Sequence, residues 1–102
     1  MHRLVETHRE ELTRLCQQYH VQRLELFGSA ATDRFDPETS DLDFLVTFEP
    51  LNFGEYAKAY FDFLAALEDL FQRHIDLVIP STVDNPYFLK EMAKTRTLLY
   101  AA

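Results

Sequence analysis

The sequence predicts an α/β fold of the α+β type, in which a small mixed β-sheet carries helices packed on one face. In two long stretches, apolar residues recur at three- and four-residue spacing, which is typical of amphipathic helices. In shorter stretches, apolar and polar residues alternate, as on a strand with one buried face. One long helix lies between two such strands, and this order indicates a right-handed crossover that makes those two strands parallel.

The composition predicts a folded protein with residues 1–102 in a single domain. At 102 residues the chain can build one core, and 47% hydrophobic and 14% aromatic residues fit a folded protein better than a disordered one. Neither a membrane-spanning run nor the apolar stretch of a signal peptide is visible. Cys16 is the only cysteine, which excludes an internal disulfide, so we expect a cytoplasmic location and no membrane partner.

The charge balance argues against direct binding of nucleic acid. The formal net charge is -7, and the basic residues form no visible cluster. Nucleic-acid affinity comes largely from neutralising phosphates, so such a surface would repel a duplex or an RNA. A nucleotide held through metal ions remains compatible with this charge, because the cations reverse the local field.

The elements follow in a simple order. A helix is expected over residues 3–20, with His8 as a core residue rather than a ligand, and a strand over residues 21–27. Gly28 and Ser29 end that strand, and a polar loop leads to a second strand over residues 40–48. The later elements are a helix over residues 54–72, a strand over 74–79, a helix over 87–95 and a short apolar tail over 97–100.

Two aspartates open the second strand and leave it on the same face. Asp41 and Asp43 are one pleat repeat apart, roughly 7 Å between their α-carbons, so their carboxylates can converge on one cation. Oxygen ligands of this kind suit Mg²⁺. Carboxylates on the solvent face of a strand are ordinary. Aspartate is nevertheless depleted in strands, and the third expected strand carries a further aspartate, Asp76.

Gly28 and Ser29 supply groups suited to a phosphate. A glycine lets backbone amides approach an anion, and a serine hydroxyl can donate to it. The short connection brings the second strand back antiparallel, which places Ser29 near Asp41. In a parallel pair, the starts of the second and third strands lie at the same end of the sheet, which brings Asp76 toward both other aspartates. Phosphate and metal ligands therefore meet, as phosphoryl or nucleotidyl transfer requires.

These motifs resemble the minimal nucleotidyltransferase (MNT) branch of the DNA polymerase beta-type nucleotidyltransferase superfamily. The resemblance covers nearly the whole chain and rests on its LFGS, SDLDFLV, IDLVIP and LLY segments. It implies that superfamily's fold, with Gly28 and Ser29 holding the triphosphate of ATP. It also implies that Asp41 and Asp43 bind two Mg²⁺ ions, and that Asp76 binds one of them and helps to activate the attacking hydroxyl.

The sequence departs from that family after Gly28-Ser29. Residues 30–40 number eleven where relatives usually have ten, and Ala30 stands where many relatives carry an arginine. Arg34 is the first candidate to supply the missing phosphate contact, and Lys58 and Arg73 are weaker candidates, although an ordinary surface charge is the default interpretation of each. The departure leaves the identity of the nucleotide open.

The MNT branch is similar to antitoxins whose partner is a HEPN-domain ribonuclease toxin. By this resemblance the protein would transfer AMP from ATP to a tyrosine of that toxin, in a hetero-oligomeric complex, and so inactivate it. Two alternatives stay open: an antitoxin that neutralises its toxin by binding alone, and nucleotidyl transfer to a small molecule. A chain this short would need dimerisation to build a small-molecule acceptor pocket.

Overall fold

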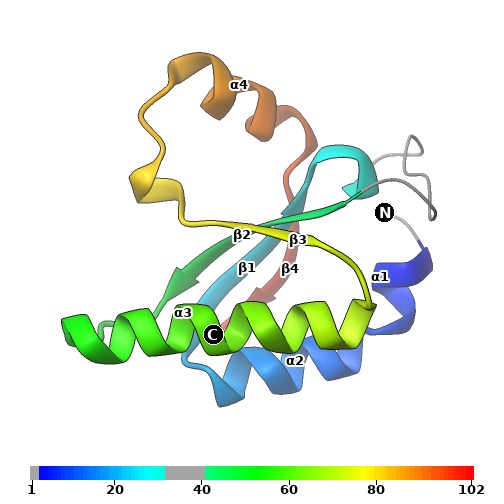
Figure 1. The fold of residues 1–102 in the computed structure, drawn as a ribbon. Helices are drawn as coiled ribbons and strands as arrows, with labels where there is room; N and C mark the ends of the chain where they lie inside the picture. Colours follow the sequence, from blue (N-terminus) through cyan, green and yellow to red (C-terminus); the bar gives the residue numbers. More distant parts are fainter. Residues whose placement is uncertain (1–2, 32–40) are drawn as a thin grey trace.

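The computed structural model of the chain describes residues 3–31 and 41–102 (Figure 1). The predicted class, a mixed sheet with helices, is confirmed. The elements are α1 (Arg3–Thr7), α2 (Arg9–Gln18), β1 (Val21–Phe27), the 3₁₀ turn η1 (Gly28–Ala31), β2 (Leu42–Phe48), α3 (Phe53–Phe71), β3 (Ile75–Val78), the 3₁₀ turn η2 (Pro80–Thr82), α4 (Pro86–Thr95) and β4 (Thr97–Ala101). None of these helices is long and apolar enough to cross a lipid bilayer.

The four strands form one sheet in the order β3-β2-β1-β4. The antiparallel neighbours of β1 are β2 and β4, and β2 runs parallel to β3. The crossover from β2 through α3 to β3 is therefore parallel, as the sequence predicts. The register of this pair sets Asp43 directly opposite Asp76.

Helices α2 and α3 lie together on one face of the sheet (Figure 1). The alternating residues of β2 that include Leu42 and Phe44 point into this main core, where Phe63 and Leu67 of α3 are fully buried. Asn52 caps the start of α3 by accepting a hydrogen bond from the Glu55 amide. The face of β2 that carries Asp43 is therefore turned away from this core.

Helix α4 lies on the opposite face (Figure 1). Its Met92 packs against Phe27 and Leu45 in a second, smaller cluster. Helices therefore cover both faces, although α2 and α3 share one face as predicted. The side chain of Asn85 caps α4 by accepting from the amides of Tyr87 and Phe88. Helix α4 thus partly covers the face of the sheet that carries Asp43 and Asp76.

Two elements differ from the prediction. The helix expected over residues 3–20 is interrupted at His8, whose backbone (φ -106°, ψ 18°) leaves the α-helical region. The His8 imidazole donates to the Leu4 carbonyl and packs edge-on against Phe71, in keeping with the predicted core role. The predicted tail over residues 97–100 is strand β4, because its backbone pairs with β1.

Candidate functional site

Three aspartates gather where β2 and β3 begin. Asp41 directly precedes β2, Asp43 is its second residue, and Asp76 is the second residue of β3. Their neighbours Leu42 and Ile75 are buried in the main core, so alternation along the strands turns Asp43 and Asp76 to the other face. The structure therefore brings together the three carboxylates that the sequence predicts.

Asp43 and Asp76 lie directly opposite each other in the register of β2 and β3, close enough for their side chains to share a hydrogen bond. Two carboxyl groups can form such a bond only when one of them carries a proton. Burial of Asp43, followed by this hydrogen bond and the nearby negative charges, raises the pKa of Asp43 to about 7. A cation bound between the two groups would take the place of such a proton.

His74 joins this group. Its Nε2 lies 3.1 Å from Oδ1 of Asp76, and the hydrogen bond to Asp76 raises the pKa of His74. The possible ligand atoms of Asp41, His74 and Asp76 all lie within 4.8 Å of one another. Sequence reasoning did not assign His74 a role, although alternation along the strand puts it on the same face as Asp76.

The donor set fits divalent cations. Asp41 and Asp76 supply the oxygen ligands that Mg²⁺ prefers, the neutral imidazole of His74 adds a nitrogen donor, and Asp43 lies directly opposite Asp76. Burial of Asp43, together with the nearby Asp76 and Asp41, raises the pKa of Asp43, and a bound cation would favour its charged form. The residues present therefore fit a metal.

Gly28 approaches the carboxylates more closely than any other residue type allows. A Cβ at position 28 would overlap Oδ2 of Asp43, and the backbone φ of +75° lies in the left-handed region. Its amide donates to Oγ1 of Thr95 at 2.9 Å. Because this amide is already bonded to Thr95, a phosphate would have to replace the threonine hydroxyl to accept from it.

The remaining predicted phosphate ligands are less fully described. Ser29 lies in η1, which packs against β2 and α4. Arg34 lies outside the described residues. The phosphate contacts of Gly28, Ser29 and Arg34 stay predictions.

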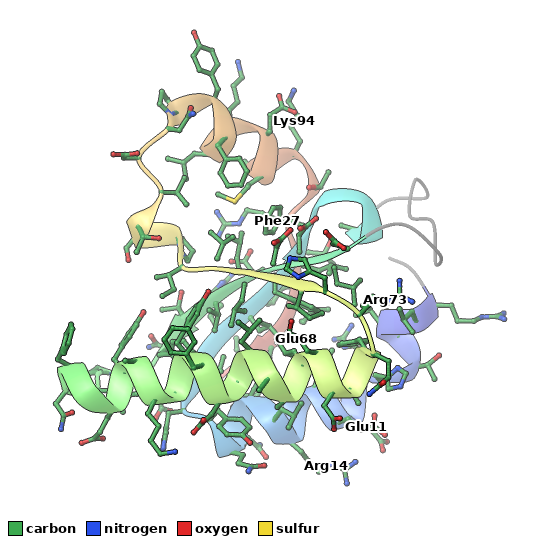
Figure 2. All side chains as sticks on the ribbon, in the orientation of Figure 1. Glu11, Arg14, Phe27, Glu68, Arg73 and Lys94 are labelled. Atoms are coloured by element: carbon green, nitrogen blue, oxygen red, sulfur yellow. The ribbon has the colours of Figure 1, made fainter. Side chains whose placement is uncertain are left out.

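A cavity of about 480 Å³ opens beside the aspartates. Its walls come from β3, α3, α4 and the ends of β1 and β2, and Figure 2 shows Phe27 between the sheet and α4. The lining residues are Phe27, Asp43, Tyr60, Ile75, Asp76, Leu77, Val78 and Phe88. A larger cavity of about 670 Å³ between α2 and α3 contains none of the three aspartates, so volume alone does not locate the site.

The comparison with protein families decides what kind of site this is. Residues 7–99 match the model of the nucleotidyltransferase domain, which includes the aspartates, His74 and the Gly28 turn. The chain belongs to the nucleotidyltransferase domain family. As the sequence predicts, the protein is therefore a nucleotidyltransferase. Members of this family typically use nucleoside triphosphates and a divalent metal ion.

Curated relatives of this nucleotidyltransferase come from Methanocaldococcus jannaschii. One is 31% identical over 78 residues, which are 76% of this chain and 76% of that protein. Another is 29% identical over 90 residues, 87% of this chain and 84% of that protein. Both are provisionally named protein adenylyltransferases.

Solved structures share the fold. A provisionally named minimal nucleotidyltransferase superposes with a TM-score of 0.71 at 28% identity, over 91% of this chain and 90% of that chain. A toxin-antitoxin structure with AMP-PNP superposes with a TM-score of 0.66 at 17% identity, over 92% of this chain and 73% of that chain. A complex of the tri-AMPylated HEPN toxin of Shewanella oneidensis with an MNT antitoxin superposes with a TM-score of 0.64 at 16% identity, over 95% of this chain and 72% of that chain. At these last two identities the likeness concerns the fold alone.

Proposed function

We propose that this nucleotidyltransferase transfers AMP from ATP to a tyrosine hydroxyl of a partner protein. The observation that carries the proposal is the alignment of Asp43 with Asp76 in register on parallel strands, with Asp41 and His74 beside them. Such a carboxylate cluster next to a glycine turn suits transfer of a phosphoryl-bound nucleotide. Two Mg²⁺ ions, held by Asp41, Asp43 and Asp76, would neutralise charge on the triphosphate and the leaving group.

The chemistry is an in-line displacement at the α-phosphorus of ATP. The tyrosine oxygen forms a bond to the α-phosphorus, while the bond from that phosphorus to the oxygen bridging to the β-phosphate breaks and pyrophosphate leaves. The phenolic proton passes to the carboxylate of Asp76, which lies half exposed at the cavity. Gly28, Ser29 and Arg34 would orient the triphosphate.

Names and folds of related proteins support a protein acceptor. The curated relatives carry the name protein adenylyltransferase, and one structure with this fold is an MNT antitoxin with its AMPylated HEPN toxin. By this likeness, the partner would be a HEPN toxin in a hetero-oligomeric complex. The net charge of -7 favours a basic partner, since opposite charges steer association.

Intact-mass spectrometry of co-purifying proteins tests this function. The wild type, Asp41→Ala and the control Asp69→Ala are each used to capture partners from the native host. Asp41 is exposed, so its removal should leave the fold intact, and Asp69 is an exposed aspartate of α3 beside the other cavity. We expect a partner carrying added AMP mass with wild type and Asp69→Ala, but not with Asp41→Ala.

Other outcomes favour the alternatives. A partner that binds all three proteins and is modified by none indicates an antitoxin that acts by occlusion. If no protein is captured and only small molecules are modified, the function is nucleotidyl transfer to a small molecule.

A further inference from the structure

The cavity beside the aspartates has two kinds of wall. Asp43 and Asp76 form a charged side, while Phe27, Val78 and Phe88 form an apolar side. The rings of Phe27 and Phe88 meet edge to face, with centroids 6.2 Å apart. An occupant must therefore present a polar group to the carboxylates and an apolar body to the rings.

The triphosphate does not suit the apolar side. Its negative charges would lose hydration against Phe27 and Phe88 without gaining a donor there. In an in-line displacement the attacking oxygen enters opposite the leaving pyrophosphate. The glycine turn η1 follows β1, whereas β3 lies beyond β2, so the part of the cavity along β3 is separated from that turn by one strand.

An adenine ring also fits poorly. The ring nitrogens and amino group of adenine need hydrogen-bond partners when buried. Among the described residues that line the cavity, Tyr60 is the only polar side chain besides the two aspartates, and its hydroxyl already donates to the Leu77 carbonyl at 2.6 Å. An aromatic ring with a single hydroxyl needs no hydrogen-bond partner besides the aspartates.

We propose that this cavity receives the aromatic ring of the acceptor tyrosine, with the ring against Phe27 and Phe88 and the hydroxyl at Asp76. This inference rests on the proposed function and adds to it the determinant of acceptor choice. A serine or threonine would leave the aromatic wall exposed to water, whereas a tyrosine ring buries it. Phe88 is thereby a specificity-determining residue.

Phe88 offers a sharp test because its ring is 41% exposed and does not belong to the main core. The variant Phe88→Ala removes part of the cavity wall with little risk to folding. Its matched control is Phe53→Ala, since Phe53 is also an exposed helical phenylalanine, at 92%, and does not line this cavity. The two variants remove the same side chain at different places.

The probe is N-acetyl-L-tyrosinamide, titrated into the protein with Mg²⁺ and a non-hydrolysable ATP analogue and followed by NMR. We expect nuclear Overhauser effects between the ligand ring and the rings of Phe27 and Phe88. The ligand should bind about tenfold more weakly to Phe88→Ala and unchanged to Phe53→Ala. N-acetyl-L-serinamide should bind much more weakly than the tyrosine analogue.

Three results would overturn the proposal: no binding of the tyrosine analogue, equal binding of both analogues, or contacts of Phe88 with the adenine protons of the nucleotide. The failure of the proposed function looks different. In that case no partner carries AMP in the capture experiment, whatever the tyrosine analogue does in the cavity.

Discussion

Gly28 and Asp43 fit together so closely that a side chain at position 28 would occupy the space of the Asp43 carboxylate. The preceding residue, Phe27, is the register partner of Asp43 across the antiparallel pair of β1 and β2. The glycine turn and the carboxylates that we propose to bind metal are thus parts of one packed unit.

The first prediction follows for Gly28→Ala. The new methyl group would displace the Asp43 carboxylate, and the left-handed backbone costs an L-residue about 1–2 kcal/mol. We expect a lower melting temperature and loss of Mg²⁺-dependent nucleotide binding, measured by thermal unfolding and calorimetric titration.

Gly54→Ala is the matched control, because a Cβ at Gly54 meets no atom within 4 Å and the residue lies in α3. It should retain nucleotide binding and at least the wild-type melting temperature. Equal effects of the two substitutions would contradict the close fit of Gly28 to Asp43.

The second prediction concerns pH in the absence of metal. The folded protein raises the pKa of Asp43 to about 7, whereas an unfolded aspartate titrates near about 4. The folded state therefore keeps this proton to higher pH, and the free energy of unfolding falls as pH rises from about 4 to about 7. Melting temperatures in EDTA should reveal this fall.

Asp43→Asn checks the origin of that fall. Its amide can donate to Asp76 at every pH, so this part of the pH dependence should vanish. Mg²⁺ added to wild type at pH 8 should restore stability, since the cation replaces the proton. If the free energy of unfolding of Asp43→Asn fell with pH as steeply as that of wild type, another group would be the cause.

The third prediction concerns the partly buried ion pair between Glu25 and Arg96, which anchors the end of α4. Glu25, only 6% exposed, accepts hydrogen bonds from Arg96 Nε at 2.9 Å and from an Arg96 terminal nitrogen at 2.6 Å. Glu25→Gln should cost about 1–3 kcal/mol of unfolding free energy, measured by urea denaturation at pH 7. The control Glu91→Gln alters an exposed pair with Lys94 and should change little.

This pair also predicts an acid response. Hydrogen bonding to Arg96 lowers the pKa of Glu25 in the folded protein. Its stabilisation is therefore present above the ordinary glutamate pKa and is lost as pH falls through the lower folded value. Wild type and Glu25→Gln should converge in stability at low pH; a constant difference would exclude the charge as its source.

The fourth prediction separates chemistry from binding at Asp76. Asp76→Asn should lower the single-turnover rate of AMP transfer far more than it weakens nucleotide binding, because the amide cannot accept the phenolic proton. Rapid-quench measurements and nucleotide titration of the same protein give the two quantities. A proportional loss of both would make Asp76 chiefly a nucleotide-binding residue.

The sequence predicts much of this site because its determinants are local. Alternation along β2 sets Asp43 on the face away from the core, and the crossover through α3 sets Asp76 beside it. These relationships depend on strand period and on the handedness of one connection, both readable from residue patterns.

What the sequence leaves open depends on contacts between distant residues. The tail became β4 because residues near position 98 pair with those near 25, which an apolar run of this length does not reveal. The bond from the Gly28 amide to Thr95 joins residues 67 positions apart. The face chosen by α4 is set by Met92 packing against Phe27 and Leu45.

Calorimetric titration of Mg²⁺ and a non-hydrolysable ATP analogue into wild type, Asp41→Ala and Asp43→Ala tests the central claim most directly. The account predicts that wild type binds the nucleotide only with Mg²⁺ present, and that each variant keeps its fold by circular dichroism but loses at least about tenfold in affinity. Nucleotide binding that is equally tight in EDTA, or unchanged in both variants, would contradict a metal-bound nucleotide at these aspartates.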